Sequence, residues 1–352
     1  MQRSGILGLG MHLPPQVREN DFWSPEVVAS WRPPGGAPLA LDELTPAGRE
    51  ILATMQRHAG DPFQGTRARH VLADDVPIVE LEAAAAIDAL ANSDTSAKEI
   101  DLLLTCTTPV DYLATNSACE LHERLGLPRE CFSLQVEGAQ HGFLLQLSLA
   151  DAMISSGRAT RALLVQASAP SRITDPRSPF AAVFGDGATA VVVGPVQGQR
   201  GLLGVSHRTD GRLPNTLIAS VPGKHWYDEG RSLLHLADPA GMRDILLRTV
   251  DLTVEGVRAA LASANLGPDA VDVFAMHQGT PWLRKLVEEH AGLSHTRSVD
   301  TYVTTGHLFA AFVPSTLVAA QRQGILADDQ VVVIAGGGNG MTYGAAVLRW
   351  GR

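Results

Sequence analysis

The sequence predicts an α/β protein built from two similar halves. Short apolar runs typical of strands alternate with longer stretches whose apolar residues recur at helical spacing, which favours helices layered on sheets. An imperfect internal repeat indicates two related units, because residues 100–109 resemble 271–281 and residues 184–193 resemble 339–348. We expect the two units to pack face to face.

The segment 195–200 forms the predicted boundary between the halves. We therefore predict an N-terminal half over residues 1–195 and a C-terminal half over 196–352. Residues 20–66 are rich in proline and glycine and include Trp23 and Trp31. We interpret this stretch as an insertion in the first half that covers part of the molecule and does not belong to the repeating core.

Short apolar runs and helical spacing of apolar residues also predict the individual elements. Short apolar runs bounded by turn residues predict strands, in chain order at 6–10, 101–107, 162–167, 188–193, 202–206, 271–277 and 331–335. Longer amphipathic stretches, several closed by a glycine, predict helices, in chain order at 79–91, 118–125, 141–156, 242–264, 281–291 and 309–323.

Composition excludes several classes of protein. A chain of 352 residues with 45% hydrophobic and 18% charged residues can bury a sizeable core. The net charge of −9 argues against nucleic acid or an anionic membrane as the main partner. The three cysteines have no metal-ligand spacing and form no disulfide framework, and no apolar run is long enough to span a membrane. We expect a cytoplasmic protein whose partners are small molecules or proteins.

Gln140 is the most informative residue of the chain. The segment 136–143 follows an apolar strand and opens a long helix, so residue 140 lies where the helix dipole and free N–H groups favour negative charge. A cysteine thiolate would be activated in such a turn. A carboxamide cannot act as a nucleophile, so the turn looks like that of an acyl-transfer enzyme whose covalent step is removed or replaced.

Several motifs, in this order along the chain, resemble the ketoacyl synthase III family, the FabH-like condensing enzymes of the thiolase superfamily. The resemblance covers nearly the whole chain outside residues 20–60. The motifs are Gly-Phe after position 141, Phe-Gly-Asp-Gly-Ala at 184–188, Met-His-Gln at 276–278, Gly-His-Leu-Phe-Ala-Ala at 306–311 and the glycine-rich segment 336–346. It implies a thiolase-like fold, in which two pseudo-symmetric βαβαβαββ halves form a layered α-β-α-β-α sandwich, and a homodimer with a broad sheet interface.

The resemblance also implies an active site with two substitutions. Family members use a Cys-His-Asn set, in which cysteine takes the acyl group while histidine and asparagine stabilise an enolate. His277 matches the histidine, Gln140 replaces the cysteine and His307 replaces the asparagine. Under the internal repeat, Gln140 and His307 are near counterparts, each at a strand end that runs into a helix. We expect these three residues to converge with the triple glycine at the floor of one buried tunnel.

The remaining site residues are expected around that set. A backbone N–H from the glycines at 336–338, with Gly337 and Gly338 as candidates, would form an oxyanion hole together with the N–H of residue 140. His141 and Phe309 are further candidates for binding the substrate. Glu137 is a weaker candidate for a base. No metal site is expected.

Two other predictions concern cysteine and arginine. The resemblance implies that Cys119 is a buried structural cysteine and not the missing nucleophile. Arg67, Arg69 and Arg172 are candidates to meet a phosphopantetheine phosphate or an acidic carrier protein. The turn at 64–69 lacks the residues with which related proteins grip coenzyme A, which weakly favours a carrier-protein donor.

Four functions remain open at this level. The chain could transfer an acyl group directly from a thioester of acyl carrier protein or coenzyme A to a small-molecule acceptor, with a histidine as base. It could decarboxylate a malonyl thioester, or serve as a non-catalytic partner subunit of a condensing enzyme. Finally, Gln140 could be an engineered replacement of cysteine. We favour the acyltransferase, in specialised metabolism, with no bound cofactor and phosphopantetheine as the substrate's carrier.

Overall fold

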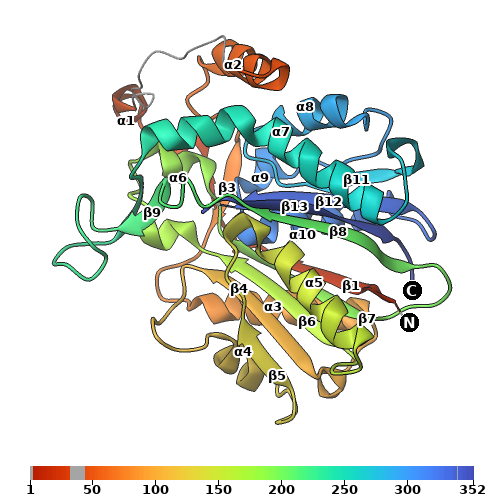
Figure 1. Cartoon of the computed structure of the whole chain (residues 1–352). Helices are drawn as coiled ribbons and strands as arrows, with labels where there is room; N and C mark the ends of the chain where they lie inside the picture. Colours follow the sequence, from red (N-terminus) through yellow and green to blue (C-terminus); the bar gives the residue numbers. More distant parts are fainter. Residues whose placement is uncertain (1–2, 32–43, 339) are drawn as a thin grey trace.

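Two β-sheets, one from each half of the chain, form the frame of the protein. The computed structural model describes residues 3–31, 44–338 and 340–352. The first sheet has the strand order β1-β7-β6-β4-β5 and the second has the order β11-β12-β13-β8 (Figure 1). Their bounds are β1 Ser4–His12, β4 Leu102–Thr108, β5 Phe132–Gln135, β6 Ala162–Ser168, β7 Gly187–Pro195, β8 Gly201–Thr209, β11 Val273–Met276, β12 Val331–Gly338 and β13 Thr342–Arg349.

The second sheet repeats the topology of the first. Its order β8-β13-β12-β11 corresponds to β1-β7-β6-β4, so the resembling segments 100–109 and 271–281 lie in β4 and β11. The counterpart of β5 is reduced to a single parallel bridge between Val273 and Arg297. In the second resemblance, between 184–193 and 339–348, β7 and β13 are counterparts. Asn339 of this stretch lies outside the described residues.

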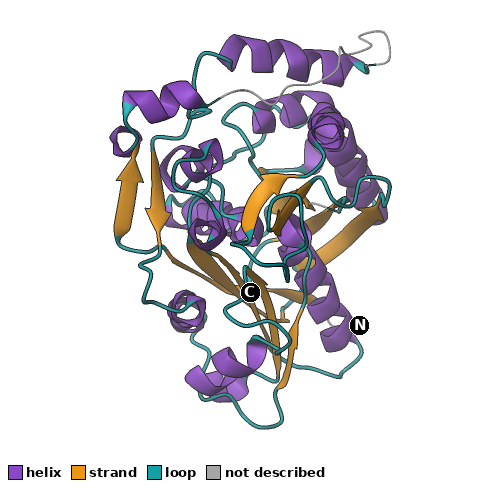
Figure 2. Cartoon of the chain, turned by 90° about the vertical axis from the view of Figure 1, so that its left-hand side faces the viewer, coloured by secondary structure: helices purple, strands orange, loops and turns teal. Residues whose placement is uncertain are grey.

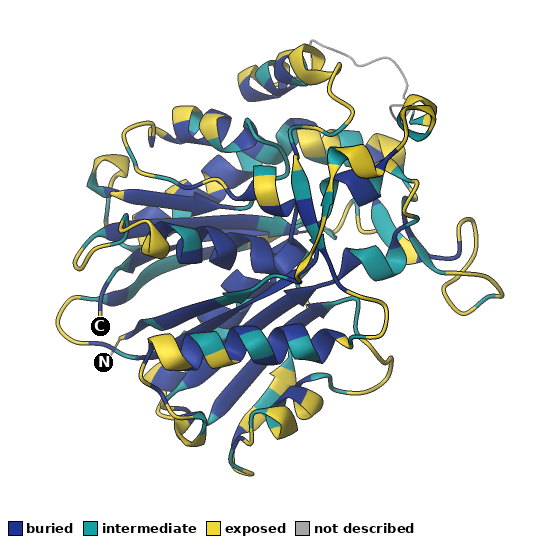
Figure 3. Cartoon of the chain, turned by 180° about the vertical axis from the view of Figure 1, so that it is seen from behind, coloured by how far each residue is buried: buried dark blue, intermediate teal, exposed yellow. Residues whose placement is uncertain are grey.

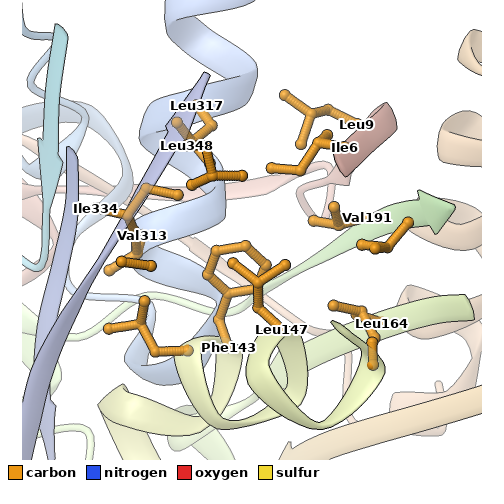
Figure 4. Packing of buried hydrophobic residues seen from close by; sticks show 14 of the residues in the cluster. Ile6, Leu9, Phe143, Leu147, Leu164, Val191, Val313, Leu317, Ile334 and Leu348 are labelled. Carbon is orange, nitrogen blue, oxygen red and sulfur yellow. The ribbon is translucent and has the colours of Figure 1, made fainter. Parts of the chain in front are cut away.

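Helices complete a five-layer sandwich. Helices α5 (Gly142–Ser155) and α10 (Phe312–Arg322) lie between the two sheets, where their apolar residues pack against both (Figures 1 and 4). On the outer faces, α3 (Ile78–Asn92) and α4 (Ala118–Arg124) cover the first sheet, and α7 (Pro239–Ser263) and α8 (Leu283–Ala291) cover the second. The predicted α-β-α-β-α layering is confirmed. The boundary at 195–200 falls between β7 and β8, and the division into halves at 1–195 and 196–352 stays a prediction.

The central layer explains why α5 and α10 are so apolar. Figure 4 shows Phe143 and Leu147 of α5 facing Val313 and Leu317 of α10, with side chains of both sheets around them. Phe143 is 1% exposed and Leu147 is fully buried. A fully buried side chain of this size contributes about 1.5–3 kcal/mol to folding, so this layer binds the two halves into one core. The outer helices keep an exposed face, and the sheets are almost wholly buried (Figure 3).

Smaller elements decorate this frame. Two two-stranded sheets pair β2 (Gln16–Glu19) with β3 (Ala68–Val71) and β9 (Leu217–Ser220) with β10 (Leu233–Leu236), and the β9–β10 hairpin projects from the body (Figures 1 and 2). The short helices are α1 (Pro25–Ser30), α2 (Pro46–His58), α6 (Pro179–Val183) and α9 (Tyr302–Thr305).

The predicted insertion at 20–66 packs onto the outside of the sandwich over its described residues. Helix α2 lies on α7, where Ala47 and Ile51 join the apolar cluster of the second sheet. Trp23 and Trp31 form an aromatic cluster with Phe63 beside α6. Residues 32–43 of this stretch lie outside the described part of the chain. Within the described ranges, no helix combines the length and apolarity that crossing a membrane would need.

Candidate active site

The turn that carries Gln140 connects β5 to α5. Residues Ala139–His141 form one 3₁₀ turn, and Ala139 has a φ of +45°, an unfavourable value for a residue with a Cβ. The turn is held by two hydrogen bonds, since Ala139 N–H donates to Glu137 Oε1 (2.7 Å) and His141 N–H donates to Gly138 O (2.9 Å). Glu137 therefore closes the turn, and Gln140 is only 7% exposed.

The glycine-rich end of β12 lies directly against this turn. A Cβ added at Gly338 would come within 2.6 Å of Gly138 O and 3.1 Å of Gln140 N, and one at Gly336 would reach 3.4 Å from Gln140 O. Position 338 thus needs glycine, because any side chain there would push the turn away. By contrast, the nearest atoms to a Cβ at Gly337 are at an ordinary 3.4 Å. The predicted meeting of residue 140 with the triple glycine is what the structure has.

His277 and His307 face each other at the same place. His277 follows β11, and its N–H donates to Ala335 O of β12 (3.0 Å). His307 is held by a bridge to the first half, with its N–H donating to Val183 O (2.8 Å) and its O accepting from Gly185 N–H (3.2 Å). The two Nε2 atoms are 2.5 Å apart, and the rings are nearly perpendicular at 88°. We call these two residues the site pair.

The hydrogen-bond network fixes the tautomers of the site pair. Phe309 N–H donates to His307 Nδ1 (3.3 Å), so that nitrogen carries no proton. Neutral His307 therefore carries its proton on Nε2, from which it donates to His277 Nε2. His277 in turn keeps its own proton on Nδ1. A single proton thus lies between the two nitrogens.

Burial keeps both rings of the site pair neutral. Loss of water around the imidazole lowers the pKa of His277 from 6.5 to about 4. The pKa of His307 lies well below 6.5, first because of burial and second because of the neighbouring His277. Three aromatic rings surround His307, with centroid distances of 5.4 Å to Phe184, 5.1 Å to Phe309 and 5.7 Å to Phe312. Phe309, a predicted binding residue, contacts His307 through both its ring and its N–H.

His141 lies apart from the site pair. Its ring is 1% exposed and points between α5 and the second sheet, where Nδ1 meets Gly336 O (3.1 Å) and Nε2 meets His207 Nδ1 (2.9 Å). The Gln140 turn lies against Gly338 and against the segment 309–311, and His307 contacts both His277 and Phe309. The His141 ring turns away from them towards His207. Sequence reasoning missed His207, because nothing in an isolated β8 strand indicates that its side chain reaches α5.

The cysteines offer no replacement nucleophile. Cys106 is fully buried beneath the Gln140 turn, with Sγ 4.0 Å from Ala139 O, and burial raises the pKa of its thiol. The prediction that Cys119 is buried is wrong, because it is exposed on α4, whose buried residues are Ala118 and Leu121. Within the described ranges, no three His, Cys, Asp or Glu side chains are grouped to hold a metal ion.

The proposed phosphate contacts are wrong for two arginines. Arg69 is fully buried, and its guanidinium is bound to Thr66, Asn20 and backbone oxygens of Arg18 and Ala182. Arg172 donates to the backbone oxygens at positions 73, 74 and 76. Neither guanidinium is free to meet a ligand phosphate. Arg67 is exposed, and its role stays a prediction.

The buried tunnel also stays a prediction. One hollow of about 290 Å³ lies against α7 and α8 and is lined by Asp251, Glu255 and His290, among others. Another of about 130 Å³ lies between α3 and α4, where Glu82 and Thr107 line it. Neither of these two hollows is lined by the site pair or Gln140.

Comparison with known proteins identifies relatives along the entire chain. Residues 134–211 match the family described as 3-oxoacyl-[acyl-carrier-protein] synthase III, and residues 261–350 match the C-terminal family of the same enzyme. The beta-ketoacyl-[acyl-carrier-protein] synthase III of Geobacillus kaustophilus is 29% identical over 350 residues, which is 99% of both chains.

Solved structures of related enzymes have the same fold as this chain. The 3-oxoacyl-(acyl carrier protein) synthase III, FabH, of Pseudomonas aeruginosa has a TM-score of 0.80 and 26% identity, and covers 100% of this chain and 99% of its own. OleA of Xanthomonas campestris has a TM-score of 0.77 at 19% identity, with 99% and 97% covered, and shows the shared fold alone. The predicted thiolase-like fold is therefore confirmed.

Proposed function

Because this chain belongs to the 3-oxoacyl-[acyl-carrier-protein] synthase III family of the thiolase superfamily, we propose that it is an acyltransferase acting on carrier-bound acyl thioesters without a cysteine acyl-enzyme. The acyl group passes directly to a small-molecule alcohol or amine. The site pair supplies the base, and the backbone of the Gln140 turn and the triple glycine supplies the oxyanion site.

The hydrogen bond from Phe309 N–H to His307 Nδ1 is the observation that carries this proposal. An enolate-stabilising site offers two N–H donors to one carbonyl oxygen, as the family's histidine and asparagine do. Here His307 Nδ1 is occupied by Phe309 N–H, so the two facing nitrogens share one proton. Supplying a second donor would require an imidazolium, which a pKa of about 4 disfavours at neutral pH. A pair with one donor and one acceptor suits base catalysis.

The reaction follows from that arrangement. When the thioester carbonyl enters, His307 Nε2–H turns to it, and His277 Nε2 is left with a free lone pair. His277 takes the proton of the acceptor O–H or N–H, whose oxygen or nitrogen attacks the carbonyl carbon. The N–H groups of residue 140 and the glycine loop hold the oxyanion. The C–S bond then breaks, and the leaving thiolate takes the proton from His277.

Gln140 has a positional role in this proposal. Its backbone N–H lies at the start of α5, beside Gly338, which is where a developing negative charge is stabilised. Its side chain forms no bond with the acyl group. Cys106 is sealed below the same turn, so the acyl group has no thiol to enter.

Phosphopantetheine is the proposed carrier of the acyl group, on acyl carrier protein or coenzyme A. The names of the relatives support this, since those enzymes are named for acyl carrier protein. We also propose a homodimer. Strand β5 is an edge strand that pairs only with β4, and it exposes Phe132 (53%) and Leu134 (38%) on alternate positions. A second copy of β5 would cover this edge.

Acceptor dependence tests the proposal. The protein is incubated with an acyl thioester and with a malonyl thioester, with and without a panel of alcohols and amines, and intact mass is followed for substrate and protein. We expect loss of the acyl group only when an acceptor is present, with no acyl adduct on the protein. Carbon dioxide release without an acceptor would establish the decarboxylase instead, and inertness towards every thioester would favour a non-catalytic subunit.

Two variants sharpen the same test. His307→Asn restores a second N–H donor next to His277, so it should shift activity from acyl transfer towards malonyl decarboxylation. Gln140→Cys should acquire an acyl adduct visible by mass, because its thiol would lie at the start of α5. Condensation activity in Gln140→Cys that exceeds the transfer rate of the original protein would favour an engineered or recently lost nucleophile.

A further inference from the structure

A second pair of histidines lies behind the site, in a network that the proposed reaction does not use directly. His141, at the start of α5, contacts Gly336 O through Nδ1 (3.1 Å) and His207 Nδ1 through Nε2 (2.9 Å). His207 of β8 continues to Ser148 Oγ through Nε2 (2.6 Å). Ser148 lies two turns along α5 from His141 and therefore on the same side of the helix. We call His141, His207 and Ser148 the relay.

The geometry of the second sheet makes room for the relay. Gly336 of β12 pairs with Gly344 of β13, which pairs with His207 of β8, so the three residues form one row across the sheet. A Cβ at Gly344 would meet Ser206 O at 1.9 Å and the His141 ring at 3.1 Å. The His141 ring thus lies over a glycine in the middle of the row and reaches both neighbours. A helix of the first half is fastened here to the sheet of the second.

Each proton of the relay has one possible place. A carbonyl oxygen only accepts, so His141 Nδ1 carries a proton and donates to Gly336 O. Neutral His141 then accepts at Nε2 from His207 Nδ1–H, and neutral His207 accepts at Nε2 from the Ser148 hydroxyl. Burial lowers the pKa of both rings, which keeps them neutral. The hydrogen bonds point in one direction, from Ser148 to Gly336.

The relay ends on the peptide group that joins the first two glycines of the loop. The peptide whose oxygen is Gly336 O also contains Gly337 N–H, a predicted oxyanion donor. Aligned hydrogen bonds polarise one another, so donation to Gly336 O makes Gly337 N–H a stronger donor. Donation also fixes the end of β12 against the Gln140 turn, which the backbone of His141 itself completes.

We propose that His141, His207 and Ser148 are positioning residues that set the place and the donor strength of the glycine loop at Gly336–Gly338. This inference rests on the proposed acyl transfer only for its effect on rate, because the structural part stands without it. The ring nitrogens of the relay are bound to one another, to Ser148 and to Gly336 O, so its residues act through the glycine loop. It joins α5 and its N-cap residue to β8 through side chains and to β12 through the backbone oxygen of Gly336.

Ser148→Ala tests the proposal with little change of volume. Without the hydroxyl, His207 can move its proton to Nε2, which reverses the relay and turns a lone pair of His141 towards Gly336 O. We expect kcat for acyl transfer to fall about tenfold, with KM unchanged, because the oxyanion donors are misplaced. Ser148→Thr keeps a hydroxyl and should restore kcat. Ser155→Ala, an exposed serine of the same helix, is the matched control and should behave as the original protein.

Amide hydrogen exchange gives a readout that needs no turnover. Ser148→Ala should accelerate exchange at Gly336–Gly338, and its NMR spectrum should lose the His141 Nδ1–H signal. Unchanged exchange and an unchanged His141 signal would overturn the relay even if activity fell. Faster exchange with an unaltered kcat would leave it a purely structural device and overturn its role in catalysis. If no thioester reacts with the original protein, exchange still decides the structural part, so the two failures are distinguishable.

Discussion

The site pair and the relay place histidines in contact in two different ways. Both pairs are joined between ring nitrogens, at 2.5 Å for His277 and His307 and at 2.9 Å for His141 and His207, and burial keeps all four rings neutral. The two histidines of the relay are hydrogen-bonded at both ends of the pair, His141 to Gly336 O and His207 to Ser148 Oγ. The site pair is tied at one end only, where Phe309 N–H meets His307. Among the described residues, His277 Nδ1 has no hydrogen-bond partner.

The free end determines which of the two histidine pairs can work as a catalyst. A chain of hydrogen bonds with both ends occupied has one stable proton arrangement, so it holds structure in place. In a pair with one end unbound, the hydrogen bond between the two rings can be replaced by one to a substrate. The other ring then presents a basic nitrogen. Histidine side chains thus serve two purposes. Which one they serve depends on whether the ring nitrogen that faces away from the partner histidine has a hydrogen-bond partner.

The largest expected effect comes from removing the base. His277→Gln keeps a side chain of similar length but cannot accept and release a proton near neutral pH. We expect acyl transfer to fall by about 10²- to 10⁴-fold, the usual worth of a general base. The matched control is His58→Gln, a change at an exposed histidine at the end of α2. Turnover of His277→Gln within twofold of the original protein would contradict the role of the site pair.

A smaller but sharper effect is expected in the glycine loop. Gly338→Ala places a Cβ 2.6 Å from Gly138 O, so the Gln140 turn must move, and we expect kcat/KM to fall by about 10²-fold. Gly337→Ala makes only ordinary contacts at 3.4 Å and should retain most of the activity. Measurement of kcat/KM for both variants compares two neighbouring positions of one strand. A larger loss of kcat/KM in Gly337→Ala than in Gly338→Ala would contradict the contact between Gly338 and the Gln140 turn.

The last expected effect concerns stability and belongs to the relay. His141 has a pKa lowered from 6.5 to about 4 in the folded protein, so the unfolded chain binds a proton first as the pH falls. Its contribution to stability is fully present above pH 6.5 and is lost as the pH falls towards 4. Between pH 7 and 4.5 the original protein should lose about 2–3 kcal/mol more than His141→Phe. Urea denaturation at both pH values measures this difference.

Other buried groups make the comparison with the variant necessary. Burial raises the pKa of Glu82 to about 7. Protonation of this carboxyl therefore stabilises the folded protein as the pH falls over much the same range, which opposes the loss of stability caused by the histidines. The pH dependence of the original protein alone therefore does not isolate His141. Equal pH dependence in the protein and in His141→Phe would contradict a neutral, buried His141.

Much of the fold could be predicted from local patterns, and the exceptions have physical reasons. Strands such as β6 and β12 are buried on both faces and read as continuous apolar runs. Strand β5 was expected only as the apolar strand before residue 136 and was given no bounds, because its four residues alternate between exposed and half-buried. Helix α2 was also absent, since it lies within a stretch whose prolines and glycines favour loops.

The site could be predicted in part. Motifs located Gln140, His277, His307 and the triple glycine. Gln140 and His277 come after strands β5 and β11, and the glycines end β12. The expectation that His307 lies at a strand end is wrong, because it follows α9 and has only an isolated bridge to Phe184. Sequence could not show that Phe309 N–H sets the tautomer of His307, since that depends on a φ of +47° at Phe309. Nor could it show that His141 turns away towards His207, which requires the glycine row of the second sheet.

The most direct test of the central claim is the protonation of the site pair, observed by ¹⁵N NMR of the imidazole nitrogens between pH 6 and 8. We expect a protonated Nε2 on His307, an unprotonated Nε2 on His277, and no change over this range. Protons on both Nε2 atoms would contradict it, because the site would then offer two donors and no base.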